Sequence, residues 1–238
     1  MFEFPTPAHL EASIAIGMTT IGYMCFWSVV SSEKPVGWME RWYQGETARE
    51  MKIYLQRATG VLMYGIIPAC IYVWLGHSGP ADFGLRIKWE FIDTQWAFIL
   101  CALALIIARL SSPKPKSHLI YPEVRTRAWG RGTLLRSAFW WASYFLAYET
   151  MFRGFLLFSC VEAFGTGPAL VINLALYALT HVAKTMDEAI GAVIMGTILC
   201  IVTLQTGTIW VAFLVHTTLS LSNEWWSLRF HPEIGLKG

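Results

Sequence analysis

The sequence predicts an all-α polytopic membrane protein, and three observations lead to that fold class. Of the 238 residues, 55% are hydrophobic and only 14% are charged, whereas a soluble domain carries about a quarter charged residues. Twelve Trp and 14 Phe make the apolar residues bulky as well as numerous. The apolar residues also gather in long stretches, many of which approach the ~20 residues that a helix needs to cross a bilayer. A soluble domain of this composition would expose large apolar patches.

We expect a transmembrane helix bundle of about seven spans (six to eight). The apolar stretches are residues 10–30, 60–76, 94–110, 134–164, 166–183, 188–205 and 208–227. Turn-forming residues separate them, as at Gly79-Pro80, Ser112-Pro113, Gly167-Pro168 and Thr206-Gly207. The stretch 134–164 is long for one span, which indicates a helix that is tilted, kinked or extended beyond the bilayer.

The chain is expected to have two parts, N-terminal spans (1–79) and a core bundle (80–238). Within the first part, segment 36–58 mixes aromatic residues with Glu and Arg. This pattern fits an amphipathic helix lying at the inner membrane interface. A connector with interfacial aromatic residues fits it equally well.

The distribution of basic residues predicts the orientation. With the N-terminus outside, the inside loops and the C-terminal tail hold 13 of the 18 Lys and Arg residues, and the outside segments hold only Arg86 and Lys88. Positive loops stay on the cytoplasmic side. We therefore predict an integral protein of the bacterial inner (plasma) membrane, with its N-terminus outside and its C-terminus cytoplasmic. The net charge of +2 gives no indication of a nucleic-acid partner.

Four ionisable residues are singled out as functional candidates well inside the predicted spans, where a charge costs ~3 kcal/mol or more. They are Glu149, Arg153, His181 and His216. Glu149 and Arg153 are i, i+4 on one helix, which favours an ion pair. Glu149 is the only carboxylate expected deep in the core, and His181 is expected nearer the inner end than the other groups. A carboxylate and two imidazoles can hold a metal or activate a water; a packing role is the alternative.

Three short motifs around these residues resemble the CAAX prenyl protease and bacteriocin-processing (CPBP, or Abi) family. Its EExxxRG motif is matched by Tyr148-Glu149-Thr150-Met151-Phe152-Arg153-Gly154, its FxxxH motif by Tyr177 to His181, and its HxxxN motif by His216 to Ser220. Phe83-Gly84-Leu85-Arg86 resembles its GLR element. The resemblance covers about residues 80–227 and rests on the order, spacing and placement of the motifs together.

The resemblance implies a site of Glu149, His181 and His216, which activates a water for peptide hydrolysis, with Arg153 in support. The same three residues are the implied ligands if the cofactor is a divalent metal such as zinc. Two positions depart from the family pattern. Tyr148 replaces the first Glu, and Tyr, with a pKa near 10, is a poor base at neutral pH. Ser220 replaces Asn or Asp, although Asn223 lies about one turn further along the helix.

These observations support two main hypotheses. In the first, the chain is an intramembrane endopeptidase that acts on membrane-bound or prenylated peptides. In the second, it is a catalytically degenerate relative that serves as a structural or assembly subunit, with other membrane subunits as its partners. A proton-coupled transporter is less favoured, because the sequence shows no inverted repeat.

Overall fold

The computed structural model describes residues 6–76, 79–182 and 186–237 and confirms the helical bundle. The N-terminal part consists of α1 (Pro7–Val30), α2 (Lys34–Met39), α3 (Glu46–Val61) and α4 (Ile67–Trp74). A π-helical segment (Leu62–Ile66) joins α3 to α4 without a break.

The C-terminal part begins with a short 3-10 turn (Pro80–Phe83). Its helices are α5 (Phe91–Ser111), α6 (Pro115–Ile120), α7 (Arg131–Glu149), α8 (Leu157–Phe164), α9 (Thr166–Val182), α10 (Met186–Thr206) and α11 (Trp210–Phe230). A second π-helical segment (Thr150–Leu156) makes α7 and α8 one continuous helix. The strands β1 (Ala128–Trp129) and β2 (Gly235–Leu236) form a small parallel pair.

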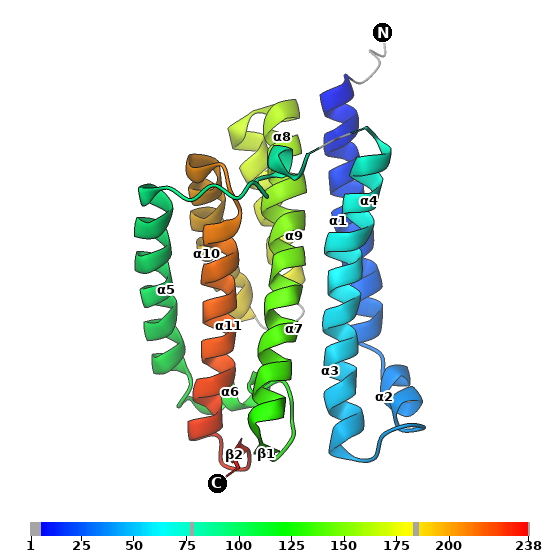
Figure 1. Ribbon diagram of the computed structural model, residues 1–238, viewed down its shortest axis with the longest axis vertical. Helices are drawn as coiled ribbons and strands as arrows, with labels where there is room; N and C mark the ends of the chain where they lie inside the picture. Colours follow the sequence, from blue (N-terminus) through cyan, green and yellow to red (C-terminus); the bar gives the residue numbers. More distant parts are fainter. Residues whose placement is uncertain (1–5, 77–78, 183–185, 238) are drawn as a thin grey trace.

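Four helical segments are long and apolar enough to cross a membrane by length and composition. In the described part of the chain these are Pro7–Val30, Glu46–Trp74, Phe91–Ser111 and Glu188–Thr206. The continuous α7–α8 helix, α9 and α11 run beside them (Figure 1). The chain is therefore an integral membrane protein built as a polytopic helical bundle.

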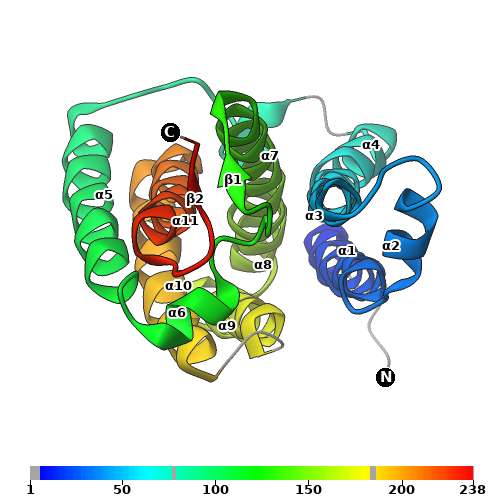
Figure 2. The ribbon, with the colours of Figure 1, turned by 90° about the horizontal axis from the view of Figure 1, so that it is seen from below.

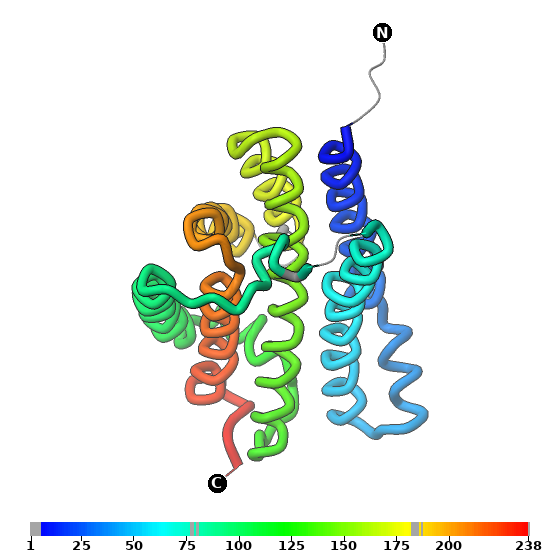
Figure 3. The backbone as a smooth tube through the Cα atoms, turned by 45° about the horizontal axis from the view of Figure 1, so that its top comes forward, coloured from blue at the N-terminus to red at the C-terminus, as the bar shows by residue number. Residues whose placement is uncertain are grey.

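The two ends of the bundle differ in what they carry. The first turn of α1 lies at one end, and β2 lies at the opposite end (Figures 1 and 3). The end that carries β2 also carries α2, α6 and β1 (Figure 1), and we call it the basic end. Segments α2, α6 and β1, which the charge distribution assigns to the inside, therefore share one end with β2.

The structure differs from the single interfacial helix expected over 36–58. Helix α2 ends at Met39, Gly45 adopts a positive φ of 55°, and α3 begins at Glu46. Residues 46–58 thus belong to a long upright helix beside α1 (Figure 1). The polar pattern reflects internal pairing: Glu50 is buried and accepts a hydrogen bond from Arg136 Nη2 at 2.7 Å.

Helices α1 to α4 form a group beside the group of α5 to α11 when the bundle is seen along its axis (Figure 2). The two groups meet where α3 packs against α7. Gly60 of α3 faces the ring of Tyr144, and a Cβ at Gly60 would lie 2.3 Å from Tyr144 Cε2. A Cβ at Gly65 would likewise lie 2.9 Å from the Cβ of Ala147. These glycines allow the two helices to approach closely.

Gly60→Ala is expected to destabilise the bundle by ~1–3 kcal/mol, because the new methyl group overlaps a ring held within an aromatic cluster. Thermal unfolding in detergent measures the change. Gly17→Ala on α1 is the matched control, since nothing lies within 4 Å of a Cβ there. Equal melting temperatures for wild type and Gly60→Ala would show that the helices do not meet at this point.

Candidate active site

Two of the predicted site residues are in direct contact at the centre of the bundle. Glu149 ends α7 and is fully buried, and its Oε1 lies 2.6 Å from Nδ1 of His216 on α11. The imidazole of His216 also stacks on the ring of Phe145, with 4.0 Å between centroids. Phe145 lies one turn before Glu149, so α7 holds His216 by both a hydrogen bond and a ring contact.

The predicted buried ion pair of Glu149 and Arg153 is confirmed. Arg153 Nε lies 3.3 Å from Glu149 Oε2, and both side chains are fully buried. The guanidinium of Arg153 lies over the ring of Tyr177 at 4.1 Å from its centroid. One oxygen of Glu149 thus faces Arg153, and the other contacts His216.

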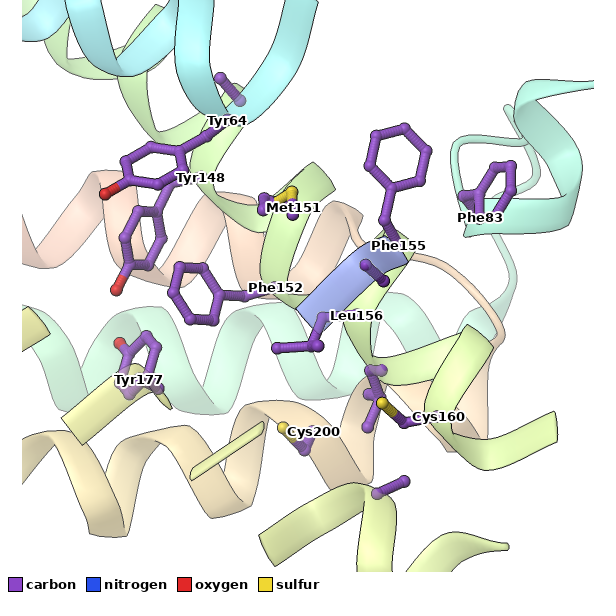
Figure 4. Close-up of a cluster of buried hydrophobic side chains, with 14 of the residues drawn as sticks. Tyr64, Phe83, Tyr148, Met151, Phe152, Phe155, Leu156, Cys160, Tyr177 and Cys200 are labelled. Carbon is purple, nitrogen blue, oxygen red and sulfur yellow. The ribbon is translucent and has the colours of Figure 1, made fainter. Parts of the chain in front are cut away.

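His181 lies beside this pair, and not nearer the inner end as predicted. Helix α9 begins at Thr166, directly after the turn at Gly165, and packs against α8. His181 and Glu149 are each 16 residues from Gly165 along these two helices, so His181 returns to the depth of Glu149. The ring of Tyr177 lies 4.7 Å from that of His181 and 6.3 Å from that of His216. Both imidazoles therefore approach the same tyrosine. Figure 4 shows Tyr177 grouped with Tyr64, Tyr148 and Phe152.

The hydrogen bonds determine the tautomer of each histidine when it is neutral. His181 Nδ1 lies 3.0 Å from the carbonyl oxygen of Tyr177, and His216 Nδ1 contacts the carboxylate of Glu149. Carbonyl and carboxylate oxygens only accept hydrogen bonds, so Nδ1 carries the proton in both rings. Nε2 is then the basic nitrogen of each imidazole.

A cavity of about 430 Å³ adjoins these groups. Its wall includes all five predicted residues other than the buried ion pair: Tyr148, His181, His216, Ser220 and Asn223. Its volume is that of a typical small-molecule site. Much of the remaining wall is aromatic or aliphatic and comes from α1, α7 and α10.

The cavity extends toward the basic end. There its wall includes Arg57 and Glu123, and it shares Gln56 and Glu123 with a second cavity of about 340 Å³. Lys52 lies at this second cavity, and its hydrogen bond to Glu33 at 2.8 Å lowers the pKa of the Glu33 carboxyl. Polar and charged residues thus line the part of the cavity that adjoins the second cavity.

Glu224, which is as fully buried as Glu149, contradicts the expectation that Glu149 is the only carboxylate deep in the core. Glu224 is fully buried on α11; its Oε1 lies 3.7 Å from Arg57 Nη2 and accepts a hydrogen bond from Ser137 at 3.1 Å. The guanidinium of Arg57 also lies 3.9 Å from the centroid of a Trp141 ring. The sequence placed Arg57 in a loop, so no partner for Glu224 could be assigned.

Comparison with known proteins identifies the family. The family model described as Type II CAAX prenyl endopeptidase Rce1-like matches residues 51–222, which is more than half of the chain and includes every predicted site residue except Asn223. The chain belongs to this Rce1-like family. The predicted resemblance is thereby confirmed. No curated protein and no solved structure matches the chain.

Three residues of the Rce1-like motifs, Gly154, Gly84 and Arg86, have structural roles in packing the first motif and the turn before α11. A Cβ at Gly154 would lie 2.8 Å from the carbonyl oxygen of Phe83, so only glycine allows the first motif to pack against the 3-10 turn. Gly84, with φ of 69°, accepts a hydrogen bond from the backbone N–H of Ile209 at 3.0 Å. Arg86 donates to the carbonyl of Thr206 at 3.2 Å. The GLR-like element thus anchors the turn before α11, which carries His216.

The side chains do not assemble as the three-ligand metal set expected from the Rce1-like resemblance. Within residues 6–76, 79–182 and 186–237, no group of three or more His, Cys, Asp or Glu is placed to hold a metal ion. Glu149 directs one oxygen to Arg153 and the other to the protonated nitrogen of His216. This arrangement fits an orienting carboxylate and does not fit a zinc ligand.

Asn173 is a buried polar residue that the sequence analysis did not single out. Its Nδ2 donates to the carbonyl of Phe152 in the π-helical segment at 2.6 Å, and its Oδ1 accepts from the thiol of Cys200 at 3.2 Å. Asn173 precedes Tyr177 and His181 at spacings of four and eight, so the three share one face of α9. This spacing is the sequence feature that indicates a place for Asn173 beside the site.

Arg153→Ala is expected to lower the stability of the folded protein by ~3–5 kcal/mol, because Glu149 would remain buried without its partner. Unfolding in detergent and the yield of monodisperse protein measure this effect. Arg229→Ala is the control: Arg229 is exposed near the end of α11, and its loss should cost at most ~0.5 kcal/mol. A wild-type melting temperature for Arg153→Ala would rule out the stabilising ion pair.

Proposed function

We propose that this chain is an intramembrane endopeptidase that cleaves membrane-bound or prenylated peptides. The observation that carries the proposal is the Glu149–His216 pair at the wall of a large cavity that His181 also lines. A buried carboxylate that accepts Nδ1–H holds an imidazole as a base and stabilises the imidazolium that it becomes. Membership of the Rce1-like family supports the same class of reaction.

The proposed mechanism uses two imidazoles on one water. The water donates one O–H to Nε2 of His181 and gives the proton of the other to Nε2 of His216 as its oxygen attacks the peptide carbonyl. Glu149 stabilises the resulting imidazolium of His216. The same proton then passes from His216 to the leaving amine. The hydroxyl of Ser220 and the amide of Asn223, which line the cavity, are the donors available to the oxyanion.

The cavity wall supports an apolar membrane substrate. Tyr23, Phe26 and Trp27 of α1 belong to the cavity lining, and rings of this kind suit a lipid chain or an apolar peptide side chain. The polar residues where the two cavities adjoin are proposed to admit water and the polar part of the peptide. The substrate is therefore proposed to enter with its cleavable bond near the cytoplasmic side.

The second candidate function is a catalytically degenerate subunit of a membrane complex. One observation favours it: both oxygens of Glu149 are already engaged by Arg153 and His216, and Tyr148 stands in place of the family's first acid. On this hypothesis Glu149, Arg153 and His216 only join α7 to α11. The cleavage experiment decides between the two candidates.

Glu149→Gln and His216→Gln are each expected to lower the rate of peptide cleavage by ~10²–10⁴-fold, the usual contribution of an acid–base group. The assay uses quenched fluorescent peptides, prenylated and unprenylated, with the protein in liposomes. Glu162→Gln is the matched control, because Glu162 is an exposed carboxylate on α8 of the same continuous helix. Near wild-type cleavage by Glu149→Gln would overturn the site. A wild type that cleaves none of the peptides, with or without added divalent metals, would support the degenerate subunit.

The proposed orientation places the basic end in the cytoplasm. Lys114→Cys lies just before α6 at that end, and Lys88→Cys lies before α5 at the other, and both positions are exposed. A membrane-impermeant maleimide should label Lys88→Cys in intact cells and Lys114→Cys only after permeabilisation. The wild-type chain, with its five cysteines, gives the background. The reverse pattern would place the N-terminus inside, and labelling of both in intact cells would contradict the span map.

A further inference from the structure

Tyr148, which departs from the family motif, makes a specific hydrogen bond to helix α9. Its side chain is buried, and its hydroxyl lies 2.8 Å from Oγ1 of Thr180. Thr180 directly precedes His181, and its Oγ1 lies 3.0 Å from His181 Nδ1. The position where the family carries an acid is therefore connected, through one threonine, to a histidine of the proposed site.

The direction of these hydrogen bonds follows from the number of available protons. Thr180 has one hydroxyl proton, which it donates to the carbonyl of Tyr177 at 2.7 Å. The oxygen of Thr180 is then an acceptor toward both Tyr148 O–H and His181 Nδ1–H. The carbonyl of Tyr177 accepts Nδ1–H as well. Two oxygens thus lie near His181 Nδ1, the hydroxyl oxygen of Thr180 and the carbonyl oxygen of Tyr177, and both act as acceptors.

We propose that Tyr148 and Thr180 are positioning residues that hold His181 with its proton on Nδ1 and Nε2 as the basic nitrogen. The proposal rests on the proposed function for its catalytic meaning. Tyr148 does not take a proton from water here; it donates to Thr180 and so joins α7, which carries Glu149, to the end of α9. Tyr148 thus replaces the family's acid with a hydroxyl that helps to orient His181 through Thr180.

The direct test is the tautomer of His181, measured by ¹⁵N NMR of histidine-labelled protein in detergent micelles. The signals of His181 are assigned by their loss in His181→Gln. The wild type is expected to show the Nδ1–H tautomer alone. Thr180→Val and Tyr148→Phe should show a mixture of tautomers, and Thr180→Ser, which keeps the hydroxyl, should match the wild type.

A second tyrosine provides the matched control. The hydroxyl of Tyr72 on α4 lies 3.2 Å from Oγ of Ser159 on α8, so it too forms a buried bond between helices. Tyr72 and Ser159 do not belong to the cavity lining. Tyr72→Phe and Ser159→Ala should therefore lower stability about as much as Tyr148→Phe and Thr180→Val, ~1 kcal/mol each. They should leave the His181 signals unchanged.

The kinetic test separates orientation from binding. Tyr148→Phe and Thr180→Val should each lower kcat by about tenfold to a hundredfold with KM unchanged, since a small displacement of a reacting group has effects of this size. The double variant should lose no more than the larger single loss, because both changes break one chain of hydrogen bonds. Thr180→Ser should restore kcat, and Tyr72→Phe should keep it.

Two results would overturn the proposal. The first is a wild-type His181 with its proton on Nε2. The second is a tautomer that is the same in wild type, Thr180→Val and Tyr148→Phe. Failure of the proposed function is a separate result: a wild type that cleaves no peptide removes the kinetic test, while the NMR measurement still decides whether Tyr148 and Thr180 position His181.

Discussion

A carboxylate enclosed in an apolar bundle must be compensated, and the centre of this structure is arranged around the compensation of Glu149. An unpaired buried charge costs several kcal/mol. Arg153 neutralises one oxygen from the same helix, and His216 donates to the other from α11. If the continuous α7–α8 helix shifted relative to α11, the buried carboxylate of Glu149 would lose its hydrogen bond to His216. This constraint determines the depth of the site.

The other elements support this centre from three sides. Asn173 ties α9 to the π-helical segment that follows Glu149, and Tyr177 of α9 covers the guanidinium of Arg153. The turn at Gly84 packs on Gly154 and anchors the start of α11. The N-terminal group of helices closes the remaining side and contributes the aromatic wall of the cavity. The result is a buried polar centre, held by packed helices, beside a cavity whose lining includes Arg57 and Glu123.

Some of this arrangement could be predicted from local pattern, and some could not. Apolar stretches locate helices, and the spacing of Glu149 and Arg153 predicts their pair, because both are properties of a single helix. The contact of Glu149 with His216 joins residues 67 apart in the chain, so no periodicity reveals it. The mixture of aromatic and charged residues in segment 36–58 fits an interfacial helix and a connector equally well, and neither predicts that residues 46–58 belong to a long upright helix. Buried partners such as Glu224 explain why Arg57 lies inside. Hydrophobic periodicity also does not show the π-helical widening at Thr150–Leu156.

The central claim is that Glu149 is an ionised carboxylate shared by Arg153 and His216, and infrared spectroscopy with ¹³C-labelled glutamate tests it most directly. The spectrum of Glu149→Gln is subtracted from that of the wild type at neutral pH, with Glu162→Gln as the reference for an exposed carboxylate. The account predicts that the difference contains the carboxylate stretch of an ionised group. A carbonyl stretch of a protonated carboxylic acid at this position would contradict it, since a neutral Glu149 could neither pair with Arg153 nor hold His216 as a base.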